Sequence, residues 1–474
     1  MRRLAIAIVI LMHPPGFAGD APTPEAVVQT HAELAWRSYL SAQVQAAVLV
    51  EAIDRFCAAP DEAGLAACRE VWRAAHDAYS PSEVFRFQDG PIDRDGGPET
   101  MINAWPLDEQ WVDATVDDPT SGLVNTGDVA LTAEVLIAYN ERDGEKNIAT
   151  GYHVIEFLLW GQDRDPKGPG NRPLTDFTTA PQADRRRQYL QTAARLLVTH
   201  LSQVQAEWAP GAANFRHRLI TGDPAVGLHA AFTGLVMLAG DELSGERLAV
   251  AYETQDQEEE QSCFSDHTWN DIQGNIAGMH MVWTGTMGAW HGPALRDLVA
   301  ARSATAAQGM DAAIATSIAA GKAIPQPFDQ TLLGGNDSPG RAALLACIEA
   351  LEAQADATVV AARAVGTTLD FGANANNAIV GCKEILENAS EILQLLKAGK
   401  RVEAAATADA MFKRWLTIES AITPIAPTIY REIEAALFGL RSAAKVDEPA
   451  MATVVSRRVA LQAAIGRVLP LLKQ

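Results

Sequence analysis

The sequence predicts an all-α protein built as two helical-bundle domains, and three observations lead to this fold class. Long stretches are dominated by alanine, leucine, glutamate and arginine, which have high helix propensity. Over residues 24–58 the apolar residues recur every three or four positions, which is the spacing of a buried helix face. Runs of β-branched residues are short, so an extensive sheet is not expected.

Two regions rich in proline, glycine and aspartate interrupt the helical pattern. The first, 80–128, contains Trp105 and Trp111, which favour an ordered loop, and loops of this length are usually functional or disordered. The second region is 162–182. The expected helices cover 24–58, 61–79, 132–140, 145–160, 183–208, 224–256, a segment ending near 284, 291–320, 339–365, 376–398, 401–421, 426–441 and 449–472.

The N-terminus has the pattern of a secretory signal peptide. Arg2 and Arg3 precede a short apolar run, and small residues follow near 18–21. We therefore expect a signal peptide over 1–21, a periplasmic or secreted mature protein, and two domains over 22–222 and 223–474. No uninterrupted apolar run of about 18 residues follows, so no transmembrane segment is expected in the mature chain.

The chain is acidic, with a formal net charge of −21 over 474 residues and a pI near 4.9. This balance disfavours binding to nucleic acid or to anionic membrane surfaces, because both are negatively charged. It is compatible with a protein that handles cations.

Five cysteines are expected to lie in the exported chain, where disulfides are chemically allowed. Cys57 and Cys68 flank a turn between two expected helices, and we expect a bridge there. Cys347 and Cys382 form a plausible second pair. Because five is odd, at least one cysteine stays free or pairs between chains, and Cys263 is the candidate.

The most informative segment is 150–163, an apolar run that contains His153 and Glu156. Residues three apart lie on one face of a helix, so an imidazole and a carboxylate point toward one place from a segment that favours burial. A buried carboxylate needs a partner, which could be a metal ion or an arginine. The alternative is a purely structural His–Glu pair. The spacing is not His-Glu-x-x-His, so a zinc peptidase would need ligands from distant parts of the chain.

Two further polar clusters could contribute to such a site. Glu83 and Arg86 could form a surface ion pair, or one of them could face His153 and Glu156. Asp266 precedes an expected helix, so it could cap that helix or complete the His153 site. For Glu242, Glu246 and Arg247 a salt-bridge role is the simpler interpretation.

Several of these segments resemble those of the imelysin family, also called imelysin-like or iron-regulated protein A-like proteins. Gly151-x-His153-x-x-Glu156 coincides with the Gly-x-His-x-x-Glu signature of that family, and Glu-Phe-Leu-Leu-Trp-Gly-Gln-Asp continues in register. The resemblance covers roughly residues 28–440. Other matching segments are 85–87, 91–93, 105–108, 242–247 and 263–266.

The resemblance implies two helical bundles with a site in the crevice between them, and export from a bacterial cytoplasm. The family is catalogued among metallopeptidases, but iron acquisition is its better-supported theme. In one segment this chain departs from the family pattern: the two usual histidines are replaced by Gln261 and Trp269, and His267 stands where asparagine is usual.

We therefore expect an exported imelysin-like protein that binds iron, or an iron-containing ligand, for iron uptake or homeostasis. His153 and Glu156 are the candidate metal ligands, and Asp266, Glu83 and Arg86 are further ligand-site candidates. Iron is the favoured metal and zinc is possible, because imidazole and carboxylate donors discriminate weakly between them. Other envelope iron-uptake proteins are the expected partners. The alternatives are a zinc-dependent metallopeptidase and a metal-free protein that binds peptides or small molecules.

Overall fold

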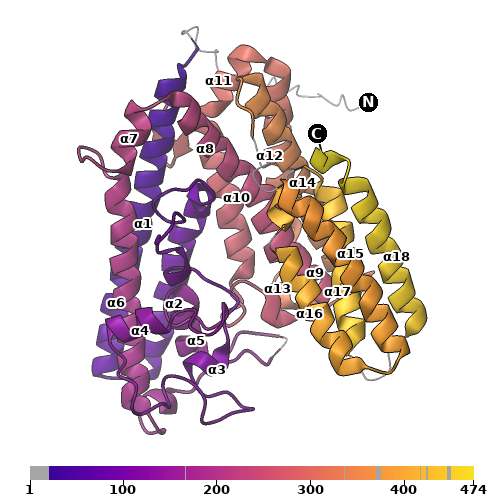
Figure 1. The fold of residues 1–474 in the computed structure, drawn as a ribbon. Coiled ribbons are helices and arrows are strands. Elements are labelled where there is room, and N and C mark those ends of the chain that lie inside the picture. Colours follow the sequence, from indigo (N-terminus) through magenta and orange to yellow (C-terminus); the bar gives the residue numbers. More distant parts are fainter. Residues whose placement is uncertain are drawn as a thin grey trace, which may run out of the picture.

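The computed structural model describes residues 21–165, 167–335, 337–369, 375–416, 418–422, 425–445 and 450–473. Helices form almost all of the regular structure in these ranges (Figure 1). A small antiparallel hairpin, β1 (Thr286–Met287) and β2 (Trp290–His291), is the exception. The all-α fold class is thus confirmed, and the predicted signal peptide lies almost entirely outside the described residues.

Three long helices form the first bundle: α1 (Pro24–Ala58) packs against both α2 (Glu62–Tyr79) and α6 (Ala183–Trp208). The side-chain oxygen of Thr23 accepts a hydrogen bond from the backbone N–H of Ala26 at 3.3 Å, which caps α1. Pro24 follows at the first helical position, where a missing N–H removes no helical hydrogen bond. These local signals explain why α1 begins where the sequence predicts.

The second bundle is built around a continuous helical segment made of α8 (Pro224–Met237), the π-helix η4 (Leu238–Ala249) and α9 (Val250–Thr254). The helix α14 packs against α8, η4 and α12, and α10 packs against α12. α10 also contacts η1, a 3₁₀ turn of the first long loop; a Cβ at Gly278 would lie only 2.3 Å from the carbonyl oxygen of Pro81 in η1. The bounds are α10 (Thr268–Thr284), α12 (Ala304–Ala323), α14 (Pro339–Ala364) and η1 (Ser80–Phe85).

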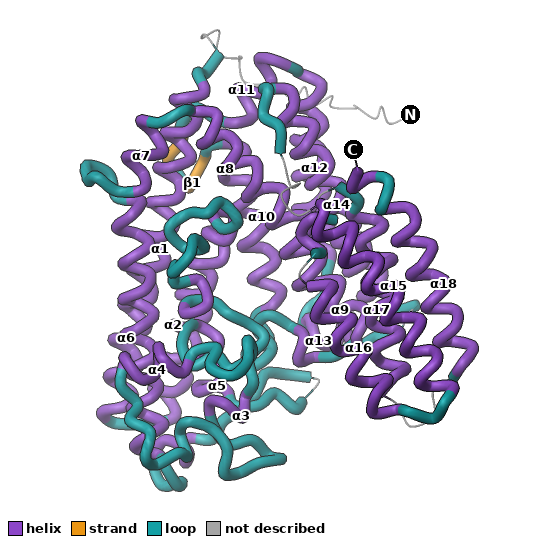
Figure 2. Tube along the Cα trace, in the orientation of Figure 1, coloured by secondary structure: helices purple, strands orange, loops and turns teal. Residues whose placement is uncertain are grey.

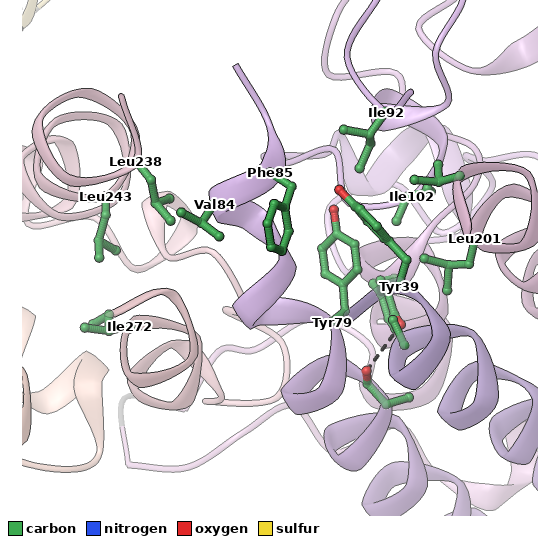
Figure 3. Close-up of a cluster of buried hydrophobic side chains, with 14 of the residues drawn as sticks. Tyr39, Tyr79, Val84, Phe85, Ile92, Ile102, Leu201, Leu238, Leu243 and Ile272 are labelled. Atoms are coloured by element: carbon green, nitrogen blue, oxygen red, sulfur yellow. Dashed lines mark hydrogen bonds between the residues drawn. The ribbon is translucent and has the colours of Figure 1, made fainter. Parts of the chain in front are cut away.

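The first two bundles share one hydrophobic core. Figure 3 shows side chains from α1, α2, η1, η4 and α10 meeting in one cluster. This core runs from Val27 to Ala362, so the buried side chains do not divide at residue 222, where the sequence analysis places the domain boundary. The physical reason is that α8 packs on α1 and η1 packs on α10, which joins the two bundles. The labelled members are Tyr39, Tyr79, Val84, Phe85, Ile92, Ile102, Leu201, Leu238, Leu243 and Ile272.

A separate four-helix bundle follows at the C-terminal end and lies beside the second bundle (Figure 1). It has its own core, which runs from Ala378 to Leu472. It joins the rest of the protein where α17 contacts η4 and α9. Its helices are α15 (Ala375–Lys397), α16 (Arg401–Leu416), α17 (Pro427–Lys445) and α18 (Met451–Val468).

The remaining helices are short and connect the bundles. Figure 2 shows that most of the loop structure gathers around α3, α4 and α5, at one end of the first bundle. The short helices are α3 (Glu109–Val112), α4 (Ala133–Tyr139), α5 (Tyr152–Trp160), α7 (Phe215–Thr221), α11 (Leu295–Arg302) and α13 (Phe328–Leu332).

All five cysteines are free thiols, so neither predicted disulfide is present. Cys347 and Cys382 belong to the two different hydrophobic cores, and this separation explains why they do not pair. Cys57 donates a weak hydrogen bond to the carbonyl oxygen of Arg187 on α6 instead of bonding to Cys68.

One helical segment among the described residues, Pro224–Thr254, is long and apolar enough to cross a membrane by length and composition. In the fold, 72% of its most apolar window is buried inside the protein. Packing at the centre of the second bundle therefore accounts for its composition.

Candidate functional site

The Gly-x-His-x-x-Glu segment forms the start of α5, and all nine residues of this helix are buried. Gly151 precedes the helix with φ of 96°, and a Cβ there would lie 2.6 Å from the carbonyl oxygen of Ile102. The backbone N–H of Tyr152 donates to that same oxygen at 2.8 Å. Glycine is therefore required at this position by both its backbone conformation and the close approach.

His153 and Glu156 contact each other as their spacing predicts. The Nδ1 atom of His153 lies 2.8 Å from Oε2 of Glu156, and both side chains are buried. The other carboxylate oxygen of Glu156 accepts two hydrogen bonds from Ser265, one from its backbone N–H at 2.9 Å and one from its hydroxyl at 2.6 Å. Both carboxylate oxygens of Glu156 thus accept hydrogen bonds, and those to the second oxygen come from Ser265 of the second bundle.

This arrangement leaves one nitrogen of the His153 ring without a protein partner. Because Nδ1 faces a carboxylate and donates to it, Nε2 is the ring nitrogen that can offer a lone pair. Nε2 is buried and has no hydrogen-bond partner within the part of the chain that the structure describes. A buried nitrogen without a partner is costly to the fold, so it marks a place where a ligand would be favourable.

A second imidazole–carboxylate pair lies next to the first. The ring centroids of His76 and His153 are 5.3 Å apart, and Nδ1 of His76 lies 2.8 Å from Oδ1 of Asp271. Nε2 of His76 hydrogen-bonds the side-chain oxygen of Asn103 at 2.9 Å. Burial alone would lower the pKa of His76, but the Asp271 carboxylate outweighs burial and raises this pKa to about 9. His76 is therefore an imidazolium ion at neutral pH.

Neither His76 nor Asp271 was predicted from the sequence as a site residue. A usable signal is present for His76, because it lies on the buried face of α2 together with Leu65, Cys68, Trp72 and Tyr79, at helical spacing. A histidine within an apolar stripe needs a polar partner. No signal in the sequence indicates that Asp271 is this partner, since the two residues come from different bundles.

Glu83 and Arg86 lie in a different ion network and do not contact His153 or Glu156 through any hydrogen bond or ion pair of the described residues. Glu83 accepts from Arg86 at 2.8 Å and from Arg247 at 2.5 Å. Burial raises the pKa of Glu83, but the two guanidinium groups outweigh it and lower this pKa to about 2. Glu242 also pairs with both arginines, at 3.0 Å and 2.7 Å.

The π-helix η4 creates part of this network. Glu242 and Arg247 are five residues apart and hydrogen-bonded, which fits the wider turn of a π-helix. Both residues line a cleft of about 290 Å³ that Arg86, Trp105 and Lys146 also line. The cleft is therefore polar and strongly charged, and Asn103, the partner of His76, contributes to its wall.

Asp266 does not act as the cap of α10, because the residue before that helix is His267 and no side chain caps it. Asp266 has φ of 56°, and the negative charges of Asp329 and Glu156 act on its carboxylate. Burial, together with the charge of Asp329, raises its pKa to about 7. Its carboxylate forms no hydrogen bond or ion pair with His153 or Glu156 among the contacts of the described residues.

The residues that replace the usual family histidines have structural partners. Gln261 accepts a hydrogen bond from Arg247 at 3.0 Å, and Trp269 donates to the carbonyl oxygen of Ile324 at 3.0 Å. His267 pairs with Asp77 at 2.9 Å. Each of these three side chains thus has a hydrogen-bond partner other than His153 or Glu156.

The donor atoms around His153 do not form a closed three-ligand set. Across the described residues, the one group of three carboxylate, imidazole or thiol ligands with donor atoms within 4.8 Å of one another lies elsewhere, near the C-terminal bundle. The site supplies one imidazole nitrogen, Nε2 of His153, with a carboxylate behind the ring. In metal sites such a carboxylate fixes the ring orientation and raises the basicity of the nitrogen.

Together, the fold and the paired imidazoles define a helical-bundle protein with a buried polar site between its first two bundles. The family model named Imelysin matches residues 35–358, and this chain belongs to the imelysin family. The C-terminal four-helix bundle lies outside the matched residues.

Individual relatives agree with this assignment. The chain is 27% identical over 334 residues to the iron-regulated protein A of Synechococcus elongatus, covering 67% of this chain and 80% of the relative. Two solved structures share the fold. A putative iron-regulated protein A precursor from Parabacteroides distasonis has a TM-score of 0.59 at 18% identity, covering 73% of this chain and 97% of that one. An imelysin-like protein from Psychrobacter arcticum has a TM-score of 0.52 at 16% identity, covering 74% and 99%.

Proposed function

We propose that this protein binds iron, as an ion or within an iron-containing ligand, with Nε2 of His153 as its protein donor. The observation that carries the proposal is the buried, unpartnered Nε2 of a ring whose Nδ1 is held by Glu156. In this role Glu156 orients the imidazole and is not itself a ligand, because both of its oxygens already accept hydrogen bonds.

One imidazole nitrogen fills a single coordination position, so other ligands must supply the rest. An iron chelate carries its own further ligands, whereas a bare ion would need water to supply them. Nitrogen donors bind iron, manganese and zinc with little discrimination, so availability and the shape of the chelate would decide the occupant. The name of the relative from Synechococcus elongatus supports iron as the theme.

The N-terminal sequence pattern supports export, and we propose a periplasmic or secreted protein that works with other envelope iron-uptake proteins. Binding at this location would serve iron capture or homeostasis, because the protein would meet iron before it crosses the inner membrane.

The geometry gives less support to the zinc peptidase alternative. A catalytic zinc site needs three protein ligands and an open position for water, usually with a carboxylate that activates the water. Around His153 the carboxylate of Glu156 is fully hydrogen-bonded. We therefore expect no metal-dependent cleavage of unfolded proteins. Cleavage that a chelator abolishes, and that Glu156→Gln also abolishes, would replace the binding proposal with the peptidase.

The test compares metal-induced stabilisation in three variants. Thermal unfolding of the wild type, His153→Ala and Glu156→Gln is measured with ferrous iron under anaerobic conditions, with ferric citrate, and with zinc. His280→Ala is the matched control, because this histidine is exposed on α10. A ligand that binds only the folded protein raises the unfolding midpoint by mass action.

We expect iron to raise the midpoint of the wild type and of the control, but not that of His153→Ala. Loss of the orienting carboxylate in Glu156→Gln should weaken binding about 10- to 100-fold. Equal shifts in all four proteins would show that His153 and Glu156 are a structural pair. Absence of any shift would favour the metal-free binding protein instead.

A further inference from the structure

Three buried glutamates meet where the C-terminal bundle contacts the rest of the protein. Glu246 comes from the π-helix η4, Glu434 from α17, and Glu419 from the 3₁₀ turn η7 (Glu419–Ala421). One carboxylate oxygen of each lies within 4.8 Å of those of the other two. Glu419 and Glu434 are buried, at 8% and 2% exposed, and Glu246 is partly buried.

Glu434 contributes a carboxylate oxygen to this cluster, and only one of its two oxygens has a hydrogen-bond partner among the described residues. Its Oε1 accepts a hydrogen bond from the indole N–H of Trp415 at 3.0 Å. Its Oε2 has no hydrogen-bond partner among the residues that the structure describes. Neither Glu434 nor Glu246 forms an ion pair within the described ranges. A buried carboxylate is normally neutralised by a positive charge, but no lysine or arginine of the described residues pairs with Glu434 or Glu246.

We propose that Glu246, Glu419 and Glu434 bind a hard divalent cation, such as Ca²⁺ or Mn²⁺, which fastens the C-terminal bundle to the imelysin domain. Three carboxylates without imidazole or thiolate form the donor set that such cations prefer. The site is separate from His153 and uses two residues that lie beyond the segment matched by the family model.

The cluster has an access route and an electrostatic driving force. Glu246 lines the 290 Å³ cleft, whose lining carries five glutamates against two arginines and one lysine, so a cation could reach the cluster from this side. Burial raises the pKa of Glu434 to about 8, and it also raises the pKa of Glu246 and Glu419. The nearby charge of Asp241 contributes to all three shifts. Carboxylates that resist ionisation in this way gain most from a cation that replaces their protons.

Glu246 extends from the π-helix η4 to the C-terminal bundle, where it accepts a hydrogen bond from Tyr430 of α17 at 3.2 Å. Arg247 of the same helix pairs with Glu83 and Glu242. Among the described residues, Arg247 forms no ion pair with a member of the cluster.

The experiment uses the full chain carrying His153→Ala, so that binding at the imidazole site cannot contribute. Thermal unfolding and Mn²⁺ binding, followed by electron paramagnetic resonance, are measured at pH 7.5–8 after removal of divalent ions. The variants are Glu434→Gln and Glu419→Gln. The matched control is Glu432→Gln, which removes an exposed carboxylate from the same helix, where it pairs with Arg467.

We expect one Mn²⁺ ion to bind per chain and both Ca²⁺ and Mn²⁺ to raise the unfolding midpoint in the parent and in Glu432→Gln. Glu434→Gln and Glu419→Gln should lose at least about tenfold in Mn²⁺ affinity. Both should still fold, because glutamine keeps the shape of the glutamate side chain and is neutral, which the buried surroundings favour. Without cations, Glu434→Gln should unfold at a higher temperature than the parent.

Equal Mn²⁺ affinity in the parent and in Glu434→Gln would overturn the proposal. So would absence of cation binding accompanied by a gain in stability on acidification, because protons alone would then neutralise the cluster. Neither result would bear on iron binding at His153, which is tested with different metals and variants.

Discussion

The imidazole of His76 and the carboxylate of Asp271 form an ion pair at 2.8 Å, with 0% and 1% of their side chains exposed. The pair joins α2 of the first bundle to α10 of the second. Ser262 donates a further hydrogen bond to Asp271 at 2.6 Å. This ion pair fixes the position of the ring beside His153, and its removal would affect both the stability of the fold and the candidate site.

Asp271→Asn should lower the free energy of unfolding by about 3–5 kcal/mol at neutral pH, because it leaves a buried imidazole without its counter-charge. The raised pKa of His76 adds a pH dependence. The contribution of this group is fully present below about pH 6.5 and is lost as pH rises through about 9. Urea unfolding across this range should show the decline in wild type and a smaller one in Asp271→Asn.

The exposed Asp297→Asn on α11 is the control for this measurement and should change the unfolding free energy by less than about 0.5 kcal/mol. An unchanged pH dependence in Asp271→Asn would show that His76 is not protonated in the folded protein.

Protonation of Glu83 should account for part of the loss of folding stability at acid pH. Its pKa falls from 4.5 to about 2 in the fold, so its stabilising contribution is present above about pH 4.5 and is lost as pH falls toward 2. A shift of this size corresponds to roughly 3 kcal/mol. Unfolding of Glu83→Gln should therefore depend less on pH in this window than wild type does, whereas the exposed Glu70→Gln should behave as wild type. Parallel profiles for wild type and Glu83→Gln would refute this.

Gly151→Ala should be strongly destabilising, by about 2–4 kcal/mol, because it adds both an unfavourable positive φ and a clash with the carbonyl oxygen of Ile102. Gly96→Ala separates the two causes, since Gly96 has φ of 74° but no atom within 4 Å of its Cβ position. It should cost about 1–2 kcal/mol. Chemical denaturation measures both. Equal costs would mean that the contact at Ile102 relaxes freely.

Thiol labelling tests the absence of disulfides. Native protein should react slowly with a thiol reagent, because four cysteines are buried and burial raises the pKa of the partly exposed Cys57 to about 12. Denatured protein without reductant should release all five thiols. Labelling of three or fewer thiols under these conditions would show that bridges such as Cys57–Cys68 form after all.

Much of the helical framework follows from local sequence. The bounds of α1 and α6 agree with the predicted 24–58 and 183–208, because long amphipathic segments carry their own periodicity. Short elements were predicted less well. The helix expected over 145–160 begins at Tyr152, because the positive φ of Gly151 prevents an earlier start. Neither the π-helix η4 nor the β1–β2 hairpin was predicted, since packing and not local propensity selects them.

In the candidate site, too, some contacts follow from the local sequence and others only from the tertiary packing. The sequence by itself determined the contact between His153 and Glu156, because a spacing of three residues on a helix brings two side chains together whatever surrounds them. Only the tertiary structure decided that Ser265 occupies the second oxygen of Glu156, that His76 meets Asp271, and that three glutamates from separate elements converge. These contacts join residues far apart in the chain, and their distances depend on how whole bundles pack, which no local spacing encodes.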